Sequence, residues 1–181
     1  MPENNNGETY SFDVCSQCRS ICCQDAKPPL TEKRKKVIQE YLKKQKIRVQ
    51  NPFGRERYYY PAVDEQVYCR LFNKKTGKCL VHQVKPETCL AGPITFNINF
   101  FTRKVEWFLK KSEICAYAGI LYADNAAFKQ HLEIAKRQIT QLIKELDAEE
   151  LRAIMQIEEP QTFKISENDL PTEAIRKLGL K

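Results

Sequence analysis

Residues 94–110, ITFNINFFTRKVEWFLK, show most directly how this chain folds. Apolar side chains alternate with polar ones in both halves of the stretch, first at Phe96, Ile98 and Phe100 and then at Val105, Trp107 and Leu109. A period of two is that of a strand with one buried face. The stretch therefore predicts an antiparallel hairpin, although its turn, Thr102-Arg103-Lys104, lacks a glycine.

The chain before this hairpin also has the pattern of short strands, from Asn51 onward. Tyr58 to Tyr60 is an aromatic run typical of a strand. Residues 67–72 and 79–82 predict a further hairpin, joined by the turn sequence NKKTGK at residues 73–78. This hairpin would carry a cysteine on each arm.

Nearer the N-terminus, after Thr31, the apolar residues follow the spacing of a helix instead of the alternation of a strand. Thr31 is a predicted N-cap, because its hydroxyl can accept a hydrogen bond from the first turn of a helix. The apolar face of this helix consists of Val37, Ile38, Tyr41 and Leu42. Its other face is rich in lysine.

The C-terminal third is predicted to be helical. A narrow apolar seam indicates a helix from about Asn125 to Leu146, and it consists of Phe128, Leu132, Ala135, Ile139, Leu142 and Leu146. We expect this seam to pack on the protein's own sheet, since a coiled coil needs more heptads. Asp147 and Glu150 resemble the cap of a shorter helix through Met155, and the polar residues 158–181 hold one amphipathic piece at 174–178.

These elements predict an α+β fold, with a small antiparallel sheet, metal-stapled cysteine loops and a C-terminal helical arm. The predicted organisation is a flexible lead-in at residues 1–12, a cysteine-cluster metal-binding domain at 13–120 and a C-terminal helical segment at 121–181. A chain of 181 residues is long enough for one such domain.

The predicted location is the cytoplasm. No apolar run approaches the roughly 18 to 20 residues that cross a bilayer. The polar opening segment, residues 1–10, lacks the features of a secretory signal. In a reducing compartment, clustered thiols more often hold metal than form disulfides, although an even number of cysteines leaves disulfides open.

The first four cysteines form the pattern C-x2-C-x3-C-C at Cys15, Cys18, Cys22 and Cys23. Four thiols within nine residues serve packing poorly, whereas a C-x2-C pair is a common two-ligand unit for zinc. Adjacent cysteines fit one tetrahedral ion badly. The pattern therefore suggests two metal ions or a cluster.

The remaining four cysteines, Cys69, Cys79, Cys89 and Cys115, complete a set of eight. Eight thiolates suffice for two closed tetrathiolate zinc sites, and one four-iron cluster would leave thiols to spare. Each of these four taken alone could equally be a small buried side chain. His82 could replace a thiolate on zinc, and His131 is interpreted as a surface or helix-packing residue.

The order of these motifs resembles the zinc- or iron-chelating domain family, the YkgJ-type cysteine cluster proteins. The matching pieces are FDVCSQCRSICC at residues 12–23, CRLFNKKTGKCLVHQVKPETC at residues 69–89, and Trp107 followed by Cys115 and Gly119. The resemblance implies that all eight cysteines belong to the metal-binding pattern. This chain has Lys85-Pro86 in place of the usual Arg-Pro pair, and Leu90 stands where arginine is common, so roles that arginines play in relatives are not carried over.

Two other functions remain open, and whether the protein is an enzyme is undecided. A related cysteine-cluster group is similar to flagellin lysine N-methylases, in which an iron–sulfur cluster accompanies methyl transfer. This chain has no glycine-rich nucleotide loop, and its two histidines offer few acid–base candidates. A nucleic-acid or protein-binding module would instead use the aromatic run at residues 58–60 and the basic helix with Lys33, Arg34, Lys35, Lys36, Lys43, Lys44, Lys46 and Arg48.

Overall fold

The predicted hairpin is present as β5 (Ile94–Asn99) and β6 (Lys104–Lys110) in the computed structural model of the protein, which describes residues 22–24, 26–155 and 161–180. Ile94 pairs with Leu109 and Ile98 with Val105, and all four side chains are buried. Phe100, expected on the same buried face, is 41% exposed because β5 ends before it.

A third strand, β7 (Thr162–Asp169), pairs antiparallel with β6 and completes the sheet in the order β5-β6-β7. The expectation that the whole C-terminal third is helical is therefore wrong for this stretch. β7 is an edge strand with no fully buried side chain, so its sequence lacks the alternation that marks β5 and β6. The register with β6 shifts between Trp107 and Phe108, which also breaks the period.

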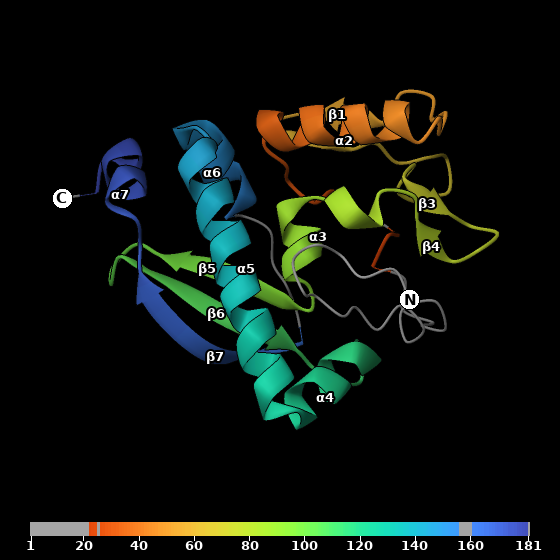
Figure 1. Cartoon of the computed structure of the whole chain (residues 1–181). Helices are drawn as coiled ribbons and strands as arrows, with labels where there is room; N and C mark the ends of the chain where they lie inside the picture. Colours follow the sequence, from red (N-terminus) through yellow and green to blue (C-terminus); the bar gives the residue numbers. More distant parts are fainter. Residues whose placement is uncertain (1–21, 25, 156–160, 181) are drawn as a thin grey trace.

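One face of the sheet is covered by helices, as Figure 1 shows. The helices of this half are α4 (Ala116–Ala123), α5 (Asn125–Glu145), α6 (Ala148–Ile154) and α7 (Thr172–Leu178). α5 carries the predicted seam into the same core as Trp107, which confirms that the seam packs on the protein's own sheet. Asp147 and Glu150 form the predicted capping box of α6.

A second, smaller core lies in the N-terminal half and consists of Ile38, Leu42, Leu71 and Val81. Its elements are α2 (Glu32–Lys44), β1 (Phe53–Arg55), β2 (Tyr59–Pro61), β3 (Phe72–Asn73), β4 (Lys78–Cys79) and the 3-10 turn η1 (His82–Val84). The hydroxyl of Thr31 caps α2 as predicted. The β3–β4 hairpin is also present, but each strand has only two residues, and Cys69 lies before β3 rather than in it.

Helix α3 (Glu87–Ala91) joins the two halves. The buried carboxylate of Glu87 accepts hydrogen bonds from the Thr31 hydroxyl at 3.0 Å and from Arg34 Nε at 3.4 Å. Arg34 also donates to Gln138 of α5 at 2.9 Å. His131 of α5 is buried, and its Nε2 donates to the carbonyls at the end of α3, so it is a packing residue and not a surface one.

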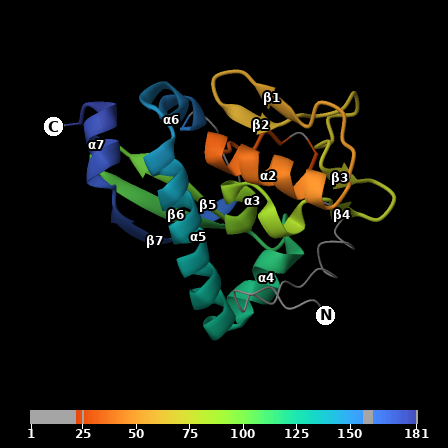
Figure 2. The ribbon, with the colours of Figure 1, turned by 45° about the horizontal axis from the view of Figure 1, so that its top comes forward.

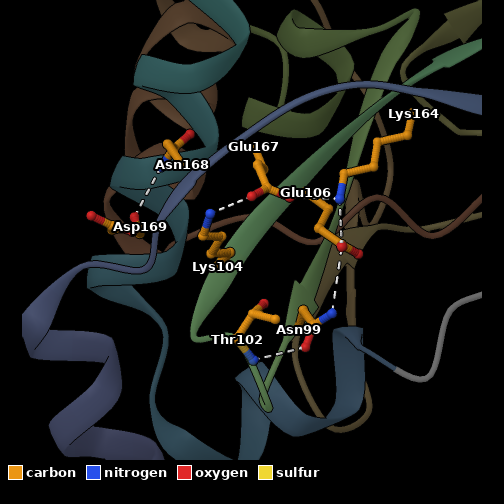
Figure 3. Close-up of polar contacts among 8 residues, drawn as sticks. All are labelled: Asn99, Thr102, Lys104, Glu106, Lys164, Glu167, Asn168 and Asp169. Carbon is orange, nitrogen blue, oxygen red and sulfur yellow. Dashed lines mark hydrogen bonds and ion pairs between the residues drawn. The ribbon is translucent and has the colours of Figure 1, made fainter.

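The other face of the sheet carries polar and charged side chains, shown in Figure 3. Glu167 of β7 accepts from Lys104 of β6 and, at 2.6 Å, from Lys164 of its own strand. Lys164 also donates to Glu106 at 2.8 Å. In a regular strand, side chains three positions apart, such as those of Lys164 and Glu167, point to opposite faces. Here they share one face because the register shift between β6 and β7 lies between these two residues.

In the part of the chain that the structure describes, no helix combines the length and apolar character needed to span a bilayer. The α+β class with small antiparallel sheets is confirmed. The division at residues 12 and 120 stays a prediction.

Candidate metal centre

The described cysteines lie in or beside short elements at five places in the chain. Cys22 and Cys23 form a turn near the N-terminus, and Cys69 precedes β3. Cys79 ends β4, and Cys89 lies in α3. Cys115 is the N-cap residue of α4. Cys15 and Cys18 lie outside the described residues.

Backbone hydrogen bonds bring the first of these parts together. The N–H of Cys69 donates to the carbonyl of Cys23 at 2.7 Å, and Gln24 forms a β-bridge with Tyr68. Phe72 then pairs with Cys79 across the β3–β4 hairpin. The turn that carries Cys23 is thereby fixed against the hairpin that presents two further thiols (Figure 1).

The thiols of these parts lie within electrostatic reach of one another. Burial raises the pKa of Cys89, and negative charge on Cys79, Cys22 and Cys69 raises it further. Burial likewise raises the pKa of Cys69 to about 11, with Cys79 and Cys22 adding to the shift. Several thiols that each raise the pKa of a neighbour therefore lie close together, where ionising more than one of them is unfavourable.

The thiols of Cys22 and Cys23 affect each other's pKa in opposite directions. A hydrogen bond from Cys23 lowers the pKa of Cys22 to about 6, and the positive charges of Lys110 and Lys85 act in the same direction. The same hydrogen bond raises the pKa of Cys23, and burial adds to this effect. Cys22 is thus the thiol of this group that ionises first.

Lys85, between η1 and α3, is the cation that faces most of the group. Its charge lowers the pKa of four side chains: Cys22, Cys79, Cys89 and His82. Lys110, at the end of β6, was not anticipated from the sequence. No local pattern could reveal it, because its proximity to Cys22 arises only when the sheet packs beside the N-terminal turn.

His82 follows Cys79 by three residues and is half-buried. Burial lowers its pKa to about 4, and the charge of Lys85 adds to the shift. The imidazole is therefore neutral at pH 7, which is the form that binds a metal ion.

Cys115 has a different environment from the other described cysteines. It packs against the core formed by the sheet and α5, whereas Cys69 and Cys79 pack against the smaller core around Ile38. Its backbone N–H donates to the carbonyl of Lys111 at 3.0 Å, one residue beyond Lys110.

Within residues 22–24, 26–155 and 161–180, no three side chains of His, Cys, Asp or Glu have the geometry to hold a metal ion as they stand. The chemistry of the donor set nevertheless fits a thiophilic metal. Thiolates are the ligands of structural zinc and of iron–sulfur clusters. Five described thiols, Cys22, Cys23, Cys69, Cys79 and Cys89, interact electrostatically with one another.

Comparison with known proteins identifies the family. The model of the CxxCxxCC family, whose description is "Putative zinc- or iron-chelating domain", matches residues 14–116. No curated protein and no solved structure matches the chain. Since the matched region covers more than half of the chain and contains all eight cysteines, this protein belongs to the CxxCxxCC family of zinc- or iron-chelating domains.

Proposed function

We propose that this protein binds zinc or iron through its cysteine thiolates, and that the bound metal stabilises the fold. The ligands are drawn from the complete set of eight: Cys15, Cys18, Cys22, Cys23, Cys69, Cys79, Cys89 and Cys115. The observation that carries the proposal is that backbone pairing brings the Cys22–Cys23 turn beside Cys69 and Cys79, where these thiols and that of Cys89 affect one another's pKa.

A cation would relieve the electrostatic conflict within this group. Thiolates that repel one another in a buried place become favourable when a divalent ion lies between them, and binding then releases their protons. Lys85 and Lys110 already supply positive charge at this place. Two lysines cannot balance four or more thiolates, so the group is better matched to a metal ion than to ammonium groups alone.

The metal would also connect parts of the chain that lie far apart in the sequence. The turn at Cys23 is attached to the strand region at Cys69 by one short backbone hydrogen bond and a bridge. Along the chain, Cys79 precedes η1 and Cys89 follows it. Metal binding would therefore couple these parts in one cooperative unit, as it does in other small thiolate domains.

The experiment is anaerobic purification of the whole chain, followed by metal and sulfide analysis and a visible absorption spectrum of the same sample. Colourless protein with one or two zinc ions per chain would establish a zinc domain. Brown protein with iron and sulfide near four per chain would establish a four-iron cluster. Folded protein without metal would refute the proposal.

Two variants test the ligand assignment. Cys69→Ser and Cys89→Ser should each reduce the metal content and lower the melting temperature, because the remaining ligands no longer close the site. Val81→Thr is the matched control, since it places a hydroxyl in the same small core without removing a thiol. This control should lose stability yet keep its metal. A Cys89→Ser protein with full metal content would remove Cys89 from the ligand set.

A further inference from the structure

The excess positive charge of the chain lies in a single segment. Residues 32–57 contain ten Lys and Arg against three Glu, a net charge of +7 that equals the net charge of the whole chain. The other 155 residues are balanced, with twenty cations and twenty anions. This basic segment contains no cysteine, so its positive charge is a feature separate from the cysteine cluster.

Most of these charges are on the surface of α2 and of the loop that follows it. Ile38 and Leu42 face the small core, and the lysines occupy the opposite side of the helix. The exposed cations of the segment are Lys33, Lys36, Lys43, Lys44, Lys46, Arg48, Arg55 and Arg57, which together we name the basic face. Among the described residues, Lys33 is the one member of this set within 4.0 Å of a carboxylate, that of Glu145, and the charge of Arg57 acts on the carboxylate of Glu56 from a longer distance.

The β1–β2 hairpin extends the basic face beyond the helix. Leu30, just before α2, donates its N–H to the carbonyl of Tyr59 at 3.0 Å, and Figure 2 shows both strands beside α2. The ring of Tyr59 lies between two cations, with Lys35 Nζ at 3.8 Å and Arg55 Cζ at 4.7 Å from its centroid. Cation–π attraction thus holds charges of the helix and the hairpin on one continuous surface.

The internal contacts of the segment leave most of this charge uncompensated. Glu32 pairs with Lys35, Glu56 pairs with Lys27, and Arg34 pairs with the buried Glu87. The fold therefore gains little from the exposed lysines, and their mutual repulsion opposes folding. A clustered basic surface of this kind is the electrostatic footprint of a polyanion-binding protein.

We propose that the basic face binds the phosphate backbone of a nucleic acid. The half-buried ring of Tyr59 lies among the cations of this face, so a phosphate track along the lysines and arginines would pass beside an aromatic side chain. A lipid surface is a poorer match, because an amphipathic membrane helix needs an exposed apolar face. The apolar face of α2 is buried in the protein's own core, and none of the large exposed hydrophobic side chains of the described residues lies between residues 26 and 62.

The test is a fluorescence anisotropy titration of the metal-loaded full chain with labelled oligouridylate, oligothymidylate and a DNA duplex, each of about 20 nucleotides or base pairs. Titrations are repeated from about 50 to about 200 mM KCl. Each phosphate contact to a single strand contributes about 0.7 to the slope of log affinity against log salt concentration. We expect binding at the lowest salt concentration and a slope that reports at least about four contacts.

The main variant replaces Lys33, Lys36, Lys43 and Lys44 together by glutamine. Its matched control carries four glutamines at exposed positions outside the basic face, in place of Lys75, Lys111, Lys129 and Arg152. Both variants therefore have the same net charge. The main variant should weaken binding more than about tenfold and lower the slope by about 2.8, whereas the control should stay within about twofold. Arg55→Gln with Arg57→Gln should weaken binding as well, because the hairpin belongs to the same surface.

Three results would overturn the proposal. The first is an absence of oligonucleotide binding at about 50 mM KCl. The second is an equal loss in the control, which would show that only net charge matters. The third is tighter binding of vesicles rich in phosphatidylserine, or of polyglutamate, through the same lysines, which would assign the face to a membrane or to an acidic protein. Circular dichroism and metal analysis check that each variant is folded.

Discussion

The backbone N–H of Cys69 donates to the carbonyl of Cys23 at 2.7 Å, which joins the first cysteine cluster to the middle of the chain. If the proposed metal ties these parts together, this hydrogen bond should open more often once the metal is removed. We expect the amide of Cys69 to exchange with solvent at least about tenfold faster after chelation. Hydrogen exchange followed by NMR measures this directly.

The control for that measurement is the amide of Leu170, which donates to the carbonyl of Arg103 at 2.8 Å beside the large sheet. This amide lies in the other half of the molecule, so its protection should change little on chelation. Equal acceleration at both amides would indicate global unfolding. An unchanged Cys69 amide would show that the metal does not hold the two parts together.

Glu167 should affect stability at acidic pH. Hydrogen bonds from Lys104 and Lys164 lower its pKa from the ordinary value of 4.5 to about 2 (Figure 3). A carboxylate with a depressed pKa stabilises the folded state above its ordinary value, and this contribution is lost as the pH falls from about 4.5 to about 2. Between pH 4.5 and about 2 the free energy of unfolding should therefore fall less in Glu167→Gln than in the unmodified protein. Urea denaturation at several pH values measures this difference. A pKa of Glu167 near 4.5 by NMR would contradict the prediction.

The Trp107 indole should attach β7 to β6. Its Nε1 donates to the Asn168 side chain, and the ring is fully buried in the sheet core. Trp107→Phe removes this donor and part of the ring, so we expect the free energy of unfolding to fall by about 1–3 kcal/mol. A double-mutant cycle with Asn168→Ala should give a coupling energy of about 0.5–1.5 kcal/mol. Strictly additive losses would mean that the hydrogen bond contributes nothing to stability.

Val67 should be a site of backbone strain. It has a φ of 58°, in the left-handed region that β-branched residues avoid, and its side chain is 41% exposed. Asparagine tolerates this conformation, so Val67→Asn should raise the free energy of unfolding by about 1 kcal/mol. Val63→Asn, at a half-buried position nearby with no positive φ, should not stabilise the protein. A destabilised Val67→Asn variant would refute the strain.

Local chemistry was sufficient to predict the elements with strong patterns. Thr31 and Asp147 cap the helices expected from them, because a capping side chain bonds to the backbone of its own first turn. The alternation in residues 94–110 likewise predicted a hairpin, since the two strands and their turn are adjacent in the chain. Phe100 departs from that pattern because the turn begins one residue earlier than the alternation suggests.

Sequence alone determined the α+β class and the metal-binding family, because motif spacing and periodicity are properties of neighbouring residues. Only the tertiary structure decided that β7 completes the sheet, since an edge strand needs a partner but little burial. It also decided that Lys110 and Lys85 face Cys22, and that Arg34 reaches Glu87 and Gln138. Such contacts depend on how distant segments pack, and no local pattern encodes them.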